Sequence, residues 1–72
     1  MDIDARRREL GKRIKTERER QGISQRSFAL MVGLSQPYLS SVEQGEMNVG
    51  FNNLCKIADG LGLDLAELFI QL

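Results

Sequence analysis

The chain has 72 residues, with ten basic and ten acidic side chains, one cysteine and no histidine. This length predicts one domain over residues 1–72 with a small core, and a lone cysteine excludes an internal disulfide. Without histidine, a His/Cys metal site and most pairs of nucleophile and base are excluded. We therefore expect no enzyme, no metal and no cofactor, with chemistry based on carboxylates alone as the one catalytic class left open.

No apolar run of the sequence reaches the length of a membrane-spanning helix. The N-terminal residues include Asp2, Asp4 and three arginines, whereas a signal peptide needs an apolar stretch. We expect a soluble cytoplasmic protein without a membrane partner. The chain leaves no room for a separate ligand-binding domain, so no small-molecule ligand is expected.

The formal net charge of zero is unevenly distributed along the chain. Residues 1–26 hold nine basic and five acidic groups, a net charge of +4, whereas residues 27–72 hold Lys56 and five acidic groups, a net charge of −4. A folded domain with this dipole can present a positive face to phosphate while it stays neutral overall. An ordinary helix with many solvated charges explains the same pattern equally well.

The first predicted helix runs from about Asp4 to Gln21, with Asp2 or Asp4 as its cap. Its buried stripe is formed by Leu10, Ile14 and Gln21. Most of its basic residues are expected to face solvent or to lie along a track of phosphates: Arg6, Arg7, Arg8, Lys12, Arg13, Lys15 and Arg20.

Arg18 falls on the buried stripe of this helix. A guanidinium there has to reach water or find an acidic partner, because an unpaired buried charge is costly. Glu43 lies beside Leu39 at the edge of the apolar face of a later helix. We predict an ion pair between Arg18 and Glu43 that ties the first helix to the third; the alternative is that both side chains reach water separately.

Gly22 stands where a left-handed residue commonly ends a helix, and Ile23 then returns to the core. Ser24 caps the second helix, although Ser27 at the third position leaves the capping box incomplete. The exposed N–H groups of the first turn of this helix favour an anion, and Arg26 adds a cation there. Ser24, Gln25 and Arg26 are thus candidates for a phosphate contact, with a free surface cation as the alternative for Arg26.

Residues 25–44 read as two short helices joined by a tight turn, a helix-turn-helix. Such a motif needs a small residue where the helices cross, a residue that tolerates positive φ in the turn, and apolar anchors that face inward. Ala29 and Gly33 supply the first two. The anchors are Phe28, Val32, Leu34, Leu39 and Val42.

The helix that begins at Gln36 has the most informative pattern. Ser35 is its predicted N-cap, and Pro37 lies in the first turn, where no intrahelical donor is lost. A turn of about 100° per residue places an uncharged arc of amide and hydroxyl groups opposite the apolar face. Such groups suit base edges in a DNA major groove, although the arc alone fits an ordinary solvated face. The arc comprises Gln36, Pro37, Ser40, Ser41 and Gln44.

The predicted DNA contacts come from both helices of the motif and from the loop after it. They are Ser24, Gln25, Arg26, Gln36, Pro37, Tyr38, Ser40, Ser41, Gln44 and Asn48.

Gly45 is expected to stop this helix, and residues 46–50 form a loop. A fourth helix is predicted over residues 51–61. Cys55 lies at the edge of its apolar arc, where packing explains it better than reactivity, since no cation or second thiol is near in the sequence. The arc comprises Phe51, Leu54, Ile57, Ala58 and Leu61.

The last helix is predicted from Leu65 to about Leu72, after Gly62, with Asp64 as its cap and Glu67 in capping-box register. It is more apolar than one buried face requires, and exposed apolar surface often marks an interface. We predict a homodimer, which would set two recognition helices one DNA turn apart; a monomer with an apolar C-terminal helix is the alternative. The expected interface residues are Ala66, Phe69, Ile70, Leu72, Met47 and Val49.

Two segments, LGKRIKTERERQGISQRSFALMVGLSQPYLSSVEQG and LCKIADGLGLDLAELF, resemble the Cro and phage-repressor-like (XRE) helix-turn-helix family over residues 10–69. The resemblance implies an all-α, five-helix, lambda-repressor-like domain with the helix-turn-helix at helices 2 and 3. It implies a transcriptional repressor or activator that binds double-stranded operator DNA, usually as a dimer. By position, it assigns base or phosphate contacts to Gln25 and Gln36, base contacts to Ser40 and Ser41, and backbone contacts to Ser24 and Gln44.

The sequence departs from this family at three positions. Glu46 stands where relatives commonly carry Lys or Arg, Val49 replaces the usual proline, and Gly50 replaces a Ser or Thr cap. These differences bear on affinity more than on fold, because phosphate contacts dominate binding strength while base contacts decide sequence.

Three functional hypotheses follow from the sequence. The first is a sequence-specific, dimeric DNA-binding regulator. The second is an antitoxin or a restriction-modification controller, which a toxin or modification gene beside this one would indicate. The third is a protein-interaction module that has kept the fold and lost DNA affinity, for which the zero net charge and Glu46 speak.

Overall fold

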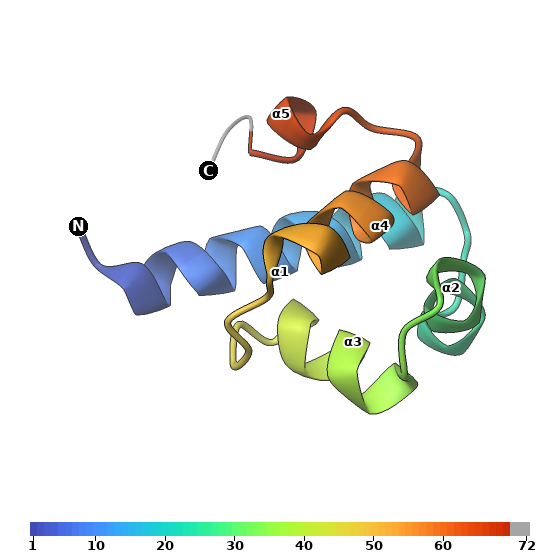
Figure 1. Cartoon of the computed structure of the whole chain (residues 1–72), viewed down its shortest axis with the longest axis horizontal. Coiled ribbons are helices and arrows are strands. Elements are labelled where there is room, and N and C mark those ends of the chain that lie inside the picture. The colour runs from blue at the N-terminus through green and yellow to red at the C-terminus, as the bar shows by residue number, and fades with distance from the viewer. Residues whose placement is uncertain (70–72) are drawn as a thin grey trace.

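The computed structural model describes residues 1–69, and within them it shows five helices and no strand. The all-α prediction is therefore confirmed. In Figure 1, the long α1 and α4 lie across the middle, α2 and α3 lie on one side of them, and α5 lies on the other. The helices are α1 (Ile3–Arg20), α2 (Gln25–Val32), α3 (Gln36–Glu43), α4 (Phe51–Leu61) and α5 (Leu65–Leu68).

Short polar side chains begin the first three helices, as the sequence predicts. The Asp2 carboxylate accepts from the Ala5 N–H at 3.1 Å. The Ser24 hydroxyl accepts from the N–H of Ser27 at 3.1 Å, and the Ser35 hydroxyl caps α3 in the same way. Each cap satisfies one of the N–H groups that a helix leaves without an internal partner.

The turn between α2 and α3 depends on Gly33. Its φ is +75°, a left-handed conformation that side chains with a Cβ rarely adopt. The N–H of the next residue, Leu34, bonds to the Ala29 carbonyl at 2.9 Å. This closes the end of α2 and turns the chain toward α3, so the predicted helix-turn-helix is present.

All five helices contribute to one apolar core. Phe28 and Leu39 of the helix-turn-helix are fully buried, together with residues from α1, α4 and α5. The angle between α2 and α3 is therefore fixed by the rest of the molecule. The core comprises Leu10, Ile14, Phe28, Ala29, Leu39, Val42, Ile57, Ala58, Leu61 and Leu68.

Two residues predicted to be buried are exposed. Gln21 was predicted on the stripe of α1, but α1 ends at Arg20, so Gln21 is its C-cap, and its side-chain amide donates to the Leu61 carbonyl at 2.8 Å. Phe51 was predicted on the apolar arc of the fourth helix and is 67% exposed. Phe51 is the first residue of α4, whose buried residues, Ile57, Ala58 and Leu61, all lie further along the helix.

The prediction for the last helix was too long. The helix α5 makes one turn and ends at Leu68, where the N–H of Phe69 bonds to the Ala66 carbonyl at 3.1 Å and tightens the turn. The Glu67 carboxylate accepts from the Asp64 N–H at 2.9 Å, as the capping-box pattern predicts. The predicted interface residues Ile70 and Leu72 lie outside the described residues.

The close approach of α1 to α3 requires a glycine. Gly11 is buried, and a Cβ built on it would lie 2.5 Å from the Val42 carbonyl oxygen and closer still to that of Glu43. Backbone oxygens at this distance cannot move aside without shifting α3. Gly11 thus sets the separation between the first helix and the third.

Gly11→Ala is expected to lower the free energy of unfolding by about 1–3 kcal/mol, because overpacking exceeds the roughly 1 kcal/mol that alanine gains in helix propensity. Urea denaturation followed by circular dichroism measures this change. Thr16→Ala, at an exposed position of the same helix, is the control and should leave stability unchanged or slightly raised. A stabilised Gly11→Ala variant would show that α1 and α3 are not in close contact.

Candidate nucleic-acid interface

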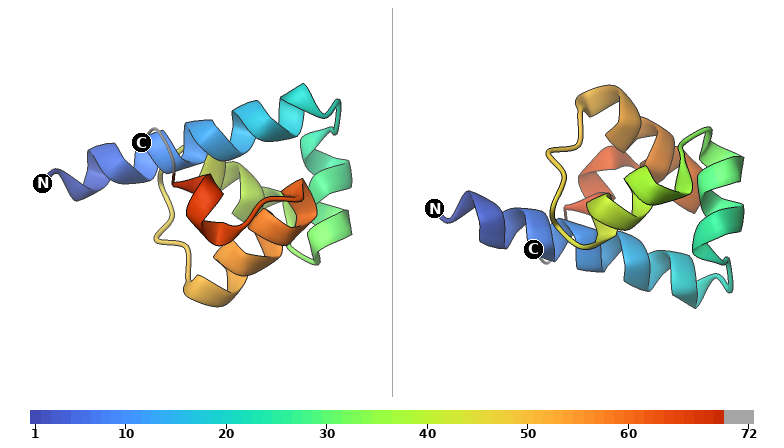
Figure 2. Two further views of the ribbon diagram at one scale, coloured as in Figure 1. Left: turned by 90° about the horizontal axis from the view of Figure 1, so that it is seen from above. Right: turned by 90° about the horizontal axis from the view of Figure 1, so that it is seen from below.

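The outward side of α3 has the composition that the sequence analysis assigned to it. Leu39 and Val42 are buried beneath the helix, which fixes its rotation. Figure 2, seen from below, shows α3 uncovered along its length on the face that it shares with α2. Of the predicted arc, three residues are exposed and two are half-buried: Gln36, Pro37 and Gln44, then Ser40 and Ser41.

A buried ion pair holds α3 against α1. Arg18 and Glu43 are 5% and 6% exposed. The guanidinium donates twice to the carboxylate, from Nε to Oε2 at 2.7 Å and from Nη2 to Oε1 at 2.9 Å. Its Nη1 also donates to the Ile23 carbonyl at 2.7 Å, which ties in the loop before α2. The predicted pair is confirmed.

The hydrogen bonds and charge of Glu43 raise the pKa of Arg18 above its ordinary value, although burial acts in the opposite direction. A raised pKa in the folded state means that folding favours the charged guanidinium. This contribution to stability is fully present at neutral pH, far below the unfolded pKa of Arg18, and is lost only as the pH rises through the strongly alkaline range.

The ion pair continues into a short chain of amide contacts. The Gln25 Nε2 donates to Glu43 Oε1 at 3.1 Å. The Gln36 Nε2 lies 3.5 Å from Gln25 Oε1, a long hydrogen bond. The structure therefore brings together the first residues of α2 and α3 on the uncovered face.

The other residues predicted to contact DNA differ in how exposed they are. Ser24, Arg26 and Asn48 are exposed. The Gln44 side-chain amide donates to the Ser40 hydroxyl at 3.1 Å. Tyr38 is half-buried, and its hydroxyl accepts from the Asn53 side-chain amide of α4 at 3.0 Å, a contact that sequence reasoning missed.

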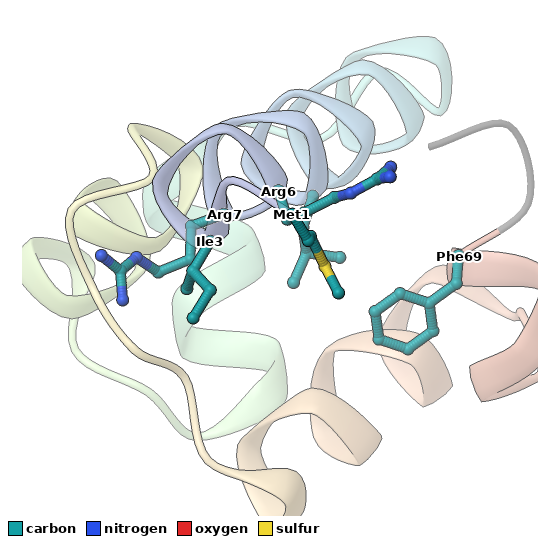
Figure 3. A pocket seen from close by; sticks show the side chains of 6 residues that line it. Met1, Ile3, Arg6, Arg7 and Phe69 are labelled. Carbon is teal, nitrogen blue, oxygen red and sulfur yellow. The ribbon is translucent and has the colours of Figure 1, made fainter.

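The residues predicted for the dimer interface divide into two groups. Ala66 and Phe69 are exposed, whereas Met47 and Val49 are half-buried and pack against the core from the loop after α3. Figure 3 shows a groove between the start of α1 and the end of α5, in which Met1 and Phe69 point toward each other.

Residues 1–69 contain no group of three or more His, Cys, Asp or Glu side chains placed to hold a metal ion. Cys55 is a free, half-buried thiol. None of the helices in this range is long and apolar enough to cross a membrane.

Comparison with known proteins gives consistent matches. Residues 14–68 match the family model described as Helix-turn-helix. The control protein C.MunI of a Mycoplasma species is 47% identical over 55 residues, which cover 76% of this chain and 74% of that protein. The regulator PuuR of Escherichia coli is 37% identical over 61 residues, but these cover 85% of this chain and only 33% of PuuR.

Solved structures agree with these sequence matches. The crystal structure of the restriction-modification controller protein C.AhdI from Aeromonas hydrophila has a TM-score of 0.90 and 35% identity, and the match covers 96% of this chain and 100% of that chain. The clp gene regulator ClgR from Corynebacterium glutamicum has a TM-score of 0.86 and 29% identity over 90% of this chain and 69% of that chain.

Glu43→Ala is expected to lower the free energy of unfolding by about 3–5 kcal/mol, because it leaves a buried guanidinium without its partner. Urea denaturation measures the loss. Glu9→Ala breaks the exposed pair between Arg6 and Glu9 and should cost less than about 1 kcal/mol.

If Glu43→Ala proves too unstable to fold, the double variant Arg18→Met/Glu43→Leu removes both charges and should recover much of the loss. Equal small losses in the Glu43→Ala and Glu9→Ala variants would contradict a buried ion pair.

Proposed function

Because the chain belongs to the helix-turn-helix family and is a DNA-binding transcriptional regulator, we propose that it reads a two-fold operator as a homodimer. The observation that carries the proposal is the uncovered, uncharged side of α3, which the core and the buried ion pair hold at a fixed angle. An α-helix fits the major groove of B-DNA, where amide and hydroxyl groups can distinguish the base pairs.

Each group on this face has a role that its chemistry supports. The Gln36 amide can bridge N6 and N7 of adenine, and the hydroxyls of Ser40 and Ser41 can bond to several bases. Gln25 stands beside Gln36 and can contact the same base pair or the adjacent phosphate. Pro37 and Gln44 lie within the same arc of α3. The remaining proposed contacts are Tyr38 of α3 and Asn48 of the loop after it.

The start of α2 supports a phosphate contact. Its first N–H groups lack internal partners and carry the positive end of the helix dipole. Ser24, Gln25 and Arg26 lie there, and Arg26 is exposed. Such contacts would set the register of the protein on the duplex, while α3 reads the sequence.

We further propose that the regulator is of the restriction-modification controller type and acts in the cytoplasm. Two observations support this over other helix-turn-helix regulators. The control protein C.MunI shares 47% identity, and the controller C.AhdI matches over its whole chain, whereas this chain spans a third of PuuR. Genes for an endonuclease and a methyltransferase beside this one, with the operator upstream of them, would support the assignment; a toxin gene in their place would indicate an antitoxin.

The homodimer is supported by the apolar surface around α5. Phe69 is 43% exposed and lies across a groove from Met1, which is almost fully exposed, and Ile3. Exposed apolar side chains that gather in one place commonly mark an interface. Two copies joined there through a two-fold axis would present two α3 helices to half-sites about 34–36 Å apart.

Gln36→Ala with Ser41→Ala is expected to abolish the preference for the operator while nonspecific binding persists. The operator is first obtained by selecting bound duplexes from a random pool, which should yield a two-fold motif. Gel-shift titration then compares the operator with a scrambled duplex, and the ratio of the two affinities should fall to about 1. The control is Thr16→Ala with Asn52→Ala, at two exposed polar positions of α1 and α4, and it should leave the ratio of the two affinities at the wild-type value. If the Gln36→Ala/Ser41→Ala variant also keeps the wild-type ratio, α3 is not the helix that reads the DNA sequence.

Phe69→Glu is expected to shift the protein from dimer to monomer, because it places a charge in an apolar contact. Sedimentation equilibrium measures the dissociation constant of the dimer. Met31→Glu changes an apolar residue of α2 that is 54% exposed and should leave the dimer intact. A Phe69→Glu protein that dimerises like the wild type would place the interface elsewhere.

A further inference from the structure

The basic residues of α1 fall into two groups according to their partners. Five arginines form ion pairs with acidic side chains. The other three basic residues are exposed and have no ion pair with any of residues 1–69. The paired arginines are Arg6, Arg7, Arg13, Arg18 and Arg20; the unpaired residues are Arg8, Lys12 and Lys15.

The three unpaired residues share one side of the helix. They follow one another at spacings of four and three, so that a turn of about 100° per residue places them within an arc of roughly 60°. We refer to Arg8, Lys12 and Lys15 as the basic stripe. Asp4 lies one turn before it, with its carboxylate engaged by Arg7, and Glu19 lies one turn after it.

The neighbours of α1 show which way the basic stripe faces. On one side of α1, Arg13 donates to the Glu67 carbonyl of α5 at 3.3 Å, and Gln21 bonds to the last residue of α4. On another side, Gly11 and Arg18 contact the end of α3. Around the circumference of α1, the basic stripe lies next to Gly11 and Arg18, on the side opposite Arg13. The stripe is therefore close to α3 and far from α5.

A direct contact fixes one end of the basic stripe beside the end of α3. A Cβ built on Gly45, just after α3, would lie 2.7 Å from both Cα and Cγ of Arg8. Figure 2, seen from below, shows the middle of α1 and the end of α3 side by side on the face where α3 is uncovered. The cations thus stand next to the proposed DNA-reading surface.

We propose that the basic stripe binds the phosphate diesters of the DNA strand that passes the C-terminal end of α3. This inference rests on the proposed function. A helix of eight residues is about 12 Å long, close to the width of the major groove, so that both of its ends approach a phosphate backbone. At the start of the motif Arg26 is available, but at the far end the loop carries the exposed acid Glu46.

The basic stripe supplies the positive charge that this loop lacks. The stripe also explains how a chain of zero net charge can bind DNA. The acidic side chains that form ion pairs with α1 are bonded to arginines outside the stripe, so they leave the charge of Arg8, Lys12 and Lys15 free for phosphate. Arg8 and Lys12 precede residues 14–68, the region that matches the family model. Two of the three residues of the stripe therefore lie outside that region.

The test compares two variants that each lose three positive charges. The first is Arg8→Gln/Lys12→Gln/Lys15→Gln. The second, the matched control, is Arg6→Gln/Arg20→Gln/Lys56→Gln, which changes exposed cations outside the stripe. Glutamine is a good helix former, and thermal melts by circular dichroism verify that both variants are folded.

Fluorescence anisotropy with a labelled duplex gives the binding constant over a range of salt concentrations. Each lost phosphate contact lowers the slope of log K against log[salt] by about 0.9. Because a dimer carries two basic stripes, the stripe variant should lose up to about 5 units of slope, and the control less than about 2. The relative preference for operator over scrambled duplex should be the same in both variants.

The outcomes separate this inference from the proposed function. A stripe variant with the wild-type slope, or a control with an equally reduced slope, would overturn the basic stripe as a phosphate site while leaving α3 as the reading helix. A wild-type protein whose DNA binding does not depend on salt would overturn both.

Discussion

The buried ion pair between Arg18 and Glu43 is the interaction on which the rest of the structure depends. It links α1 to the end of α3; in addition, Arg18 Nη1 donates to the Ile23 carbonyl and Glu43 Oε1 accepts from Gln25. The cost of removing both charges from water offsets much of the Coulomb attraction between them, so the net contribution of a buried pair to stability is modest. The main effect of the pair is on geometry. Both charges keep their hydrogen bonds only when α1, α3 and the loop that precedes α2 are held in this arrangement.

Gly11 adds a second constraint at the same contact. The ion pair requires α1 and α3 to be close, and the missing side chain of Gly11 permits it. The core below fixes the rotation of α3 through Leu39 and Val42. Together these contacts present Gln36, in the first turn of α3, beside Gln25 of α2. A reading surface of small polar groups needs this rigidity, because discrimination between bases depends on hydrogen-bond geometry.

Much of the fold could be predicted because its signals are local or chemically compelling. Ser24 and Ser35 mark helix starts, and Gly33 marks the turn. Arg18 on an apolar stripe demands an acidic partner, and Glu43 is the acid at the edge of the facing helix. These inferences need only the spacing along one helix and the cost of burying a charge.

The errors arise where the outcome depends on what covers a residue. Periodicity assigned Gln21 and Phe51 to buried faces, but Gln21 caps the end of α1 and bonds to α4 through its side-chain amide alone, and Phe51 is the exposed first residue of α4. Glu17 is 6% exposed and pairs with Arg13 and Arg20, a burial that a hydrophobic pattern cannot predict for an acid. The bond between Tyr38 and Asn53 joins two helices, so its partners are not apparent from either segment alone.

The most direct test of the central claim, that the rigidly held outer side of α3 faces DNA, is an NMR titration of the ¹⁵N-labelled protein with operator duplex. The account predicts the largest amide shifts in α3 and at the start of α2, around Gln25, Gln36 and Ser41, with little change in the buried part of α4 around Ile57. Shifts concentrated in α4 and α5, with α3 unaffected, would contradict it.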